Sequence, residues 1–444
     1  MRIVLLVILG GLVHAVTTFP TAEHASATAG ETALAVGYLL LTALLAGQIF
    51  KGIGLPRLTG YLAAGIIVGP QVLGLVSTGM VANVRLVNGV AIALIALTAG
   101  TEMRLDVLRP LFRSIAWITL IAVIGTTLLL GVTAWLLEPM LPFTAGLDDL
   151  GGIAVAAVLG VTTVAQSPAV VVALRDEMRA DGPMVRTVMA VVVLADLVVI
   201  SLFALATTLA RGALGEGADA LETAGSLAWE IFGSVAAGGI VALLLAVWLS
   251  KVKGGGALFV VGVCFVVAEV GDRLRLDPLL VALSAGMIIR NTTKVADRLH
   301  HEIEAASLPV YVAFFAVAGA TVHLDALQTV GLPAAIFVVV RALGFLVGTR
   351  LAGRVAGAAP SVRKWAAFGL MPQAGLALAL AILFQRSFPS FGADASALVF
   401  AVVALNELIC PVLFRMALVK SGEAGQLARD EGSSAEILLK ATDP

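Results

Sequence analysis

The chain has 444 residues, of which 60% are hydrophobic and only 13% are charged, about half the charged fraction of ordinary globular domains. Its formal net charge of −1 gives no general affinity for nucleic acid. The two cysteines lie inside apolar runs, which excludes a disulfide framework or a cysteine metal site. Apolar runs of about 20 residues recur without period-two alternation, so the sequence predicts an all-α polytopic membrane protein.

The N-terminal segment, residues 1–30, is predicted to be a signal peptide or an extra helix. Arg2 precedes an apolar run, and Ala25 and Ala27 fit a small-residue cleavage site. The stretch between the apolar run and Ala27 is longer than usual, so an uncleaved helix is the alternative.

About thirteen transmembrane helices are predicted after residue 30. Their approximate ranges are 32–50, 58–76, 86–103, 114–137, 150–174, 187–210, 225–250, 256–271, 277–291, 305–322, 330–349, 365–385 and 393–414. Residues 31–418 thus form the transmembrane domain, and 419–444 form a short polar tail. Most basic residues lie on alternate loops and on this tail, and cytoplasmic loops are the ones enriched in Lys and Arg. We therefore expect a multi-pass plasma-membrane protein, in a bacterium the inner membrane, with its N-terminus outside and its C-terminus in the cytoplasm.

Two ionisable residues lie near the middle of predicted spans. They are Asp196 in "VVVLADLVVI" and Arg341 in "AAIFVVVRALGFLVGTR". A carboxylate in such a stretch costs on the order of several kcal/mol, so Asp196 is a candidate functional residue. Glu407, in "VALNELICPVLF", is an accessory candidate, with a structural hydrogen-bonded glutamate equally open. His300 is predicted in a cytoplasmic loop, where pH sensing is one alternative.

The two halves of the chain contain a weak internal repeat. "LTAGTEMRLDVL" (97–108) and "AVAGATVHLDAL" (316–327) share five residues at identical spacing. Their spans are an odd number apart, so the two copies must face opposite ways across the membrane. Inverted repeats of this kind are typical of secondary transporters, whose sites lie near the midplane at broken helices.

Two predicted spans contain a helix break. Pro168 interrupts "TTVAQSPAVVV", and Pro372 with Gln373 interrupts "GLMPQAGLALAL". Simple kinks are the alternative, but freed backbone groups inside a membrane are tolerated only where they line a cavity or meet protein groups. The polar residues nearest the first break, which join Asp196 as candidate ion- and proton-binding groups, are Thr162, Thr163, Gln166 and Ser167.

A carboxylate at the midplane can bind a proton or a small monovalent cation, but not both at once. That competition is sufficient for an exchanger and needs no cofactor. Arg341 could position the carboxylate, balance its charge or stabilise the broken helices, whereas its own proton is not readily released. A purely structural ion pair between Asp196 and Arg341 is the alternative.

The motifs together resemble the monovalent cation/proton antiporters. The segments that carry the resemblance are "GLPRLTGYLAAGIIVGPQVLGL", "LTAGTEMRLDVLRP", "SPAVVVALRDE", "VVVLADLVVISLFAL" and "GLMPQAGLALALA". They are most similar to the branch with bacterial Na⁺/H⁺ antiporters and glutathione-gated K⁺ efflux systems. The resemblance implies a homodimer, a dimerisation domain, a six-helix core domain with two crossing broken helices, and elevator-type alternating access. Asp196 falls on the family's ion-binding aspartate, and Arg341 on a core-domain basic residue that is Lys in many electrogenic members.

Two departures from the family pattern bear on the chemistry. Ala195 stands where relatives have Asp, Asn or Gln, and Gln373-Ala374-Gly375 stands where relatives often have a Gly-Glu element. With Arg341 in place of Lys, the first departure indicates one carboxylate per protomer and electroneutral exchange of one Na⁺ or K⁺ for one proton. The alternatives are a partner-gated K⁺ efflux pathway or channel and a transport-inactive sensor. An enzyme is not expected.

Overall fold

The structure, a computed structural model, describes residues 27–427 except 78, 80–84, 146, 215–224, 227, 253, 323–325 and 389. The predicted signal peptide lies outside the described residues up to residue 26, as does the end of the tail from residue 428. The described part of the chain forms helices joined by short loops and contains no strand.

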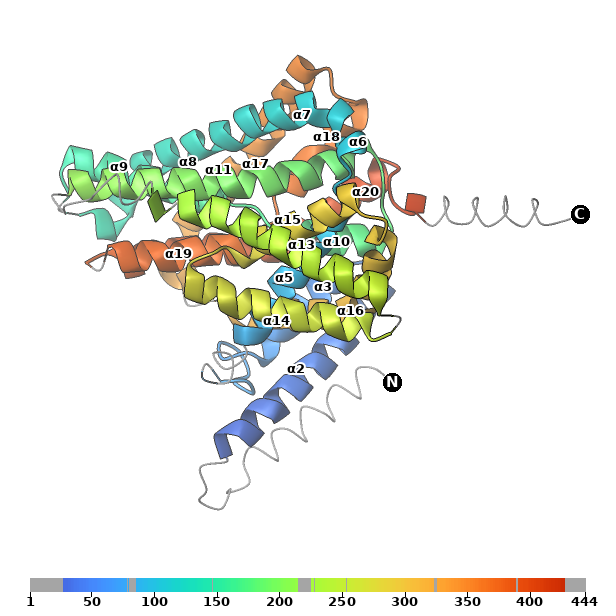
Figure 1. The fold of residues 1–444 in the computed structure, drawn as a ribbon. Helices are drawn as coiled ribbons and strands as arrows, with labels where there is room; N and C mark the ends of the chain where they lie inside the picture. The colour runs from blue at the N-terminus through green and yellow to red at the C-terminus, as the bar shows by residue number, and fades with distance from the viewer. Residues whose placement is uncertain are drawn as a thin grey trace, which may run out of the picture.

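The helices follow one another along the whole described chain (Figure 1). They are α2 (Ala27–Gly52), α3 (Arg57–Val68), α5 (Arg85–Glu102), α6 (Leu105–Leu108), η1 (Arg109–Leu111), α7 (Phe112–Trp117), η2 (Ile118–Ile124), α8 (Gly125–Leu136), η3 (Glu138–Met140), η4 (Pro142–Thr144), α9 (Asp149–Val164), α10 (Pro168–Met178), α11 (Pro183–Ala213), η5 (Trp229–Gly233), α13 (Ser234–Lys251), α14 (Gly256–Leu274), α15 (Pro278–Thr292), α16 (Ala296–Ala320), α17 (Ala326–Ala356), α18 (Pro360–Leu370), α19 (Gly375–Ser387) and α20 (Gly392–Lys420).

These helices make an all-helical polytopic membrane protein. Six helical segments of the described chain are long and apolar enough to cross a membrane, or up to eight if two bent pairs each form one span. Shorter apolar helices occupy the remaining predicted positions. Helix α16 begins at Ala296, and its second half, Ala306–Ala320, is bent by 53° from the first and starts where the sequence predicts the span. His300, expected in a loop, therefore lies in this helix.

The helices pack in two groups. The α5 group consists of α2, α3, α5, α13, α14, α15 and α16, and the α11 group consists of α7 to α11 and α17 to α20. In Figure 1 the long helices α8, α11 and α17 lie in the upper part of the view, and α2, α14 and α16 lie in the lower part. Helices α10 and α20 make the main contacts between the groups, packing against α5 and α3.

Small residues allow very close packing inside the α5 group. A Cβ on Gly100 of α5 would lie 2.2 Å from the carbonyl oxygen of Leu283, and one on Gly286 of α15 would lie 2.5 Å from that of Leu97. Backbones can approach this closely in a membrane only where the side chain is missing. The α5–α15 pair is thus a tightly fixed part of the structure.

Candidate functional site

The first predicted helix break lies between α9 and α10, deep in the α11 group. Helix α9 ends at Val164, and α10 begins at Pro168. The side chain of Ser167 accepts a hydrogen bond from the backbone N–H of Val170 at 3.3 Å, so it caps the second half-helix. Pro168 occupies the first helical position, where its missing N–H costs nothing.

The second break lies between α18 and α19, as the sequence predicts. Helix α18 ends at Leu370 and α19 begins at Gly375, with Pro372 and Gln373 in the non-helical link between them. The two halves are bent by 45°. In Figure 1, α9 and α19 extend toward one end of the bundle and α10 and α18 toward the other. The two broken segments therefore run in opposite directions, as an inverted repeat requires.

Arg341 of α17 lies between the two breaks and is only 1% exposed. Its Nη2 donates to the carbonyl oxygens of Ala165 at 2.9 Å, Val164 at 3.3 Å and Leu370 at 3.4 Å. Its Nη1 donates to the carbonyl of Met371. These carbonyls belong to the C-terminal ends of α9 and α18, where the helix dipole leaves negative partial charge. One guanidinium group therefore neutralises two half-helix ends.

A second set of polar contacts joins the same two breaks. Gln373 donates from Nε2 to the carbonyl oxygen of Thr163 at 2.8 Å, and its Oε1 accepts from Asn406 Nδ2 at 2.6 Å. Cys410 donates to the side-chain oxygen of Asn406 at 3.3 Å. Gln373 and Asn406 are both buried, at 0% and 2% exposure. Asn406 was not among the predicted site residues, although an amide within the apolar run of α20 is a visible signal.

Asp196 lies near the middle of α11 and is 4% exposed. Neither of its carboxylate oxygens has a hydrogen-bond partner among the described residues. It forms no ion pair with Arg341, so the structure does not contain the structural pair that was the alternative interpretation. Asp196 thus offers two free acceptor oxygens in a buried site.

The other candidate ligands lie at the end of α9 and are buried. The hydroxyl groups of Thr162 and Thr163 donate to the carbonyls of Val158 and Leu159, at 2.7 Å and 2.6 Å. Gln166 donates weakly to its neighbour Val164 at 3.4 Å, and its Oε1 has no partner among the described residues. A hydroxyl that donates to its own helix keeps its lone pairs available to a cation.

Glu407 follows Asn406 in α20 and takes no part in the hydrogen bonds described above. It is 2% exposed, and neither carboxylate oxygen has a partner among the described residues. No group of three or more His, Cys, Asp or Glu side chains arranged to hold a metal ion occurs in the described part of the chain.

Comparisons with known proteins agree with this architecture. A family model described as sodium/hydrogen exchanger, transmembrane, matches residues 39–420. A structure of the sodium proton antiporter MjNhaP1 from Methanocaldococcus jannaschii at pH 8 aligns with a TM-score of 0.65 at 17% identity, covering 88% of this chain and 99% of that chain. An electron-microscopy map of the same antiporter gives 0.69 at 16% identity, covering 90% and 98%. No curated protein matches the chain. The structural likeness establishes the fold, and because the family model covers most of its length, the chain belongs to the sodium/hydrogen exchanger family of membrane transporters.

Proposed function

We propose that this protein exchanges one Na⁺ or K⁺ for one proton, with Asp196 binding the two in turn. The family supports cation/proton exchange as the reaction. The observation that supports the site is the carboxylate of Asp196, which is buried in the membrane without a partner among the described residues. Such a group is strongly destabilised as a bare anion, so binding either cation removes the cost.

The exchange follows from this destabilisation. The site at Asp196 changes access from one side of the membrane to the other when a proton or a metal cation neutralises the carboxylate. It does not change access when the carboxylate is an empty anion. Gln166 Oε1, the hydroxyl groups of Thr162 and Thr163, and Ser167 are the proposed additional oxygen ligands. Because Ala195 adds no second carboxylate, the site holds either one proton or one monovalent cation at a time. One cation is therefore exchanged for one proton, and the exchange is electroneutral.

Arg341 acts as the positioning residue for the broken helices. Its contacts to the ends of α9 and α18 match this role better than direct pairing with Asp196. Family resemblance supports the further expectations of a homodimer, elevator-type movement of the core domain, and a bacterial inner membrane with the C-terminus in the cytoplasm. It also supports placement in the branch with bacterial Na⁺/H⁺ antiporters and K⁺ efflux systems.

The proposal is tested in proteoliposomes with a preset pH gradient, to which Na⁺, K⁺ or Li⁺ is added. Wild-type protein should dissipate the gradient on addition of a transported cation, whether or not the membrane potential is clamped. Asp196→Asn should abolish this response because the amide cannot take up a proton or balance a cation. Asp394→Asn, which removes an exposed carboxylate from the first turn of α20, is the matched control and should leave it unchanged.

Two results would contradict the proposal. Unchanged exchange in Asp196→Asn would show that another group binds the ions. Cation conductance without proton movement would instead indicate a channel.

A further inference from the structure

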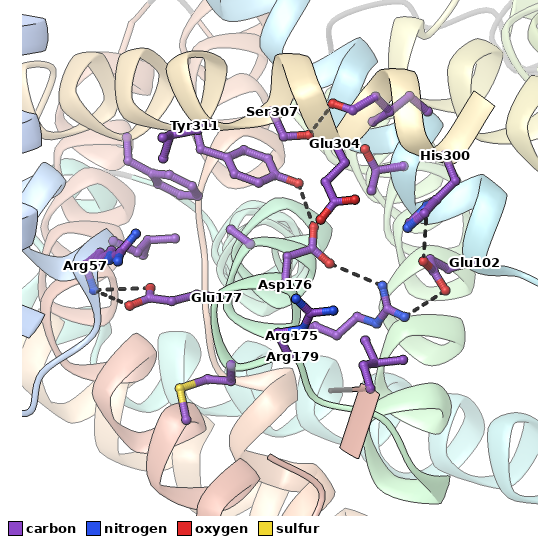
Figure 2. Close-up of a pocket in the computed structure, with 18 of the residues that line it drawn as sticks. Arg57, Glu102, Arg175, Asp176, Glu177, Arg179, His300, Glu304, Ser307 and Tyr311 are labelled. Carbon is purple, nitrogen blue, oxygen red and sulfur yellow. Dashed lines mark hydrogen bonds and ion pairs between the residues drawn. The ribbon is translucent and has the colours of Figure 1, made fainter. Parts of the chain in front are cut away.

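The last turn of α10 contains three consecutive charged residues that each contact the α5 group. Arg175 Nη2 pairs with Glu102 Oε2 of α5 at 2.7 Å, and Arg175 is only 5% exposed. Tyr311 of α16 donates its hydroxyl to Asp176 Oδ2 at 3.1 Å. His300 Nδ1 lies 3.4 Å from the other oxygen of Glu102. Figure 2 shows Asp176 and Arg175 directed toward these partners.

The third charged residue of this turn makes a different kind of contact. Glu177 accepts the backbone N–H of Arg57, at the start of α3, with both oxygens at 2.8 Å and 3.1 Å. Arg415 of α20 donates to the carbonyl oxygen of Gly54, in the link between α2 and α3. The two helices that connect the groups, α10 and α20, are thus both tied to the α5 group at the same end of the bundle.

A cavity of about 710 Å³ lies at this end, between the two groups. Its walls come from the α5 group and from α10 and α20, with Glu102, Arg175, Asp176, Glu177 and Tyr311 among the residues that line it (Figure 2). Arg290 and Asp297 line it as well, but their ion pair at 2.6 Å joins α15 to α16 within one group. The cavity is therefore crossed by contacts of two kinds, those between the groups and those inside the α5 group.

Asp196 lies outside this cavity. It is near the middle of α11, and no residue of α11 is among those that line the cavity. The structure thus joins the two groups by contacts at the cavity end, while the carboxylate of Asp196 is buried elsewhere in the α11 group.

We propose that Arg175, Asp176 and Glu177 form an ionic lock that closes the cavity end, and that opening this lock gives Asp196 access to that side. The inference rests on the proposed function, because it assigns a step of alternating access. Charge-assisted hydrogen bonds in partly buried sites each change an equilibrium by about ten- to a hundredfold. Loss of one contact should therefore raise the population of the open state measurably without preventing folding.

The test measures how fast a thiol in the cavity is alkylated. Cys264 and Cys410, both free and buried, are replaced by alanine, and Thr101, a buried cavity residue of α5, is replaced by cysteine. A membrane-impermeant maleimide is then added to vesicles in which the cavity end faces the reagent. Glu102→Gln should accelerate alkylation about tenfold, and Tyr311→Phe should accelerate it by a smaller factor.

Asp297→Asn is the matched control, because it removes an ion pair that lines the same cavity but lies within the α5 group. It should leave the alkylation rate unchanged. The lock is refuted if Glu102→Gln and Tyr311→Phe react no faster than the background protein, or if all three variants react equally fast. Thermal unfolding of each purified variant establishes that it is folded.

The readout requires no ion gradient, so it separates the two proposals. Accelerated alkylation in a protein that does not exchange ions would support the lock and reject the proposed function. Exchange with alkylation rates that none of the variants changes would support the function and reject the lock.

Discussion

Replacing Arg341 should lower the free energy of unfolding substantially, because this one side chain stabilises two half-helix ends. Its guanidinium group bonds to carbonyls at the ends of two half-helices, α9 and α18, and also lies 4.9 Å from the ring of Phe345. A cation at a partly buried helix C-terminus is worth up to about 2 kcal/mol, so two ends give up to about 4 kcal/mol. Removing the cation also removes the desolvation cost of burying it, which stabilises the variant. We expect the cost of leaving the carbonyl oxygens without hydrogen-bond donors inside the membrane to be larger.

The measurement compares Arg341→Met and Arg341→Lys with wild type by thermal and denaturant unfolding in detergent. Arg341→Met should lose up to about 4 kcal/mol. Arg341→Lys should lose about half as much, because an ammonium group keeps the charge but cannot reach both helix ends with a planar fork. If Arg341→Met unfolds within about 1 kcal/mol of wild type, within the range of an ordinary substitution, the guanidinium does not stabilise the breaks.

Two further predictions concern packing and pH. Gly286→Ala should destabilise the protein by about 1–3 kcal/mol in the same unfolding assays, because its Cβ would lie 2.5 Å from the carbonyl oxygen of Leu97. Glu423 accepts the backbone N–H groups of Met184 and Val185 at 2.8 Å each, and burial raises its pKa against the opposing effect of these bonds. The folded protein then takes up this proton at a higher pH than the unfolded chain, so wild-type stability relative to Glu423→Gln should increase as pH falls through the raised pKa and level off below the ordinary value.

A specific result would contradict each of these two predictions. Gly262→Ala is the control for packing, since a Cβ there meets nothing within 4 Å, and equal effects at the two glycines would refute the argument from close approach. For Glu423, a stability difference from Glu423→Gln that stays constant between about pH 8 and pH 4, a range that includes the ordinary carboxyl pKa, would show that its burial has no thermodynamic consequence.

The helices and their breaks could be predicted from sequence because they depend on local patterns. Apolar runs set the positions of the spans, and Pro168 and Pro372 set the positions of the two interruptions. Arg341 and Asp196 were identifiable because charged side chains are costly in a membrane. The structure adds that Arg341 contacts backbone carbonyls.

The remaining contacts were not predictable because they join residues far apart in the chain. The pair of Arg175 with Glu102 spans 73 positions, and the bond between Gln373 and the Thr163 carbonyl spans 210. Polar residues near helix ends are ordinarily solvated. The local sequence therefore does not show which of them contact a partner in another helix. Glu423, within the short polar tail, is 5% exposed and accepts hydrogen bonds from the backbone at the start of α11, a contact that the polar composition of the tail does not indicate.

The most direct test of the central claim counts the protons released when a cation binds to the purified protein. In weakly buffered detergent solution, at a pH low enough that Asp196 is protonated before the cation is added, Na⁺ or K⁺ should release protons from wild-type protein in proportion to cation bound, approaching one per protomer at saturation. Asp196→Asn should release none, while Glu102→Gln should release as many as wild type because it alters the lock and not the site. Release of two protons per protomer, or undiminished release from Asp196→Asn, would contradict a single shared carboxylate.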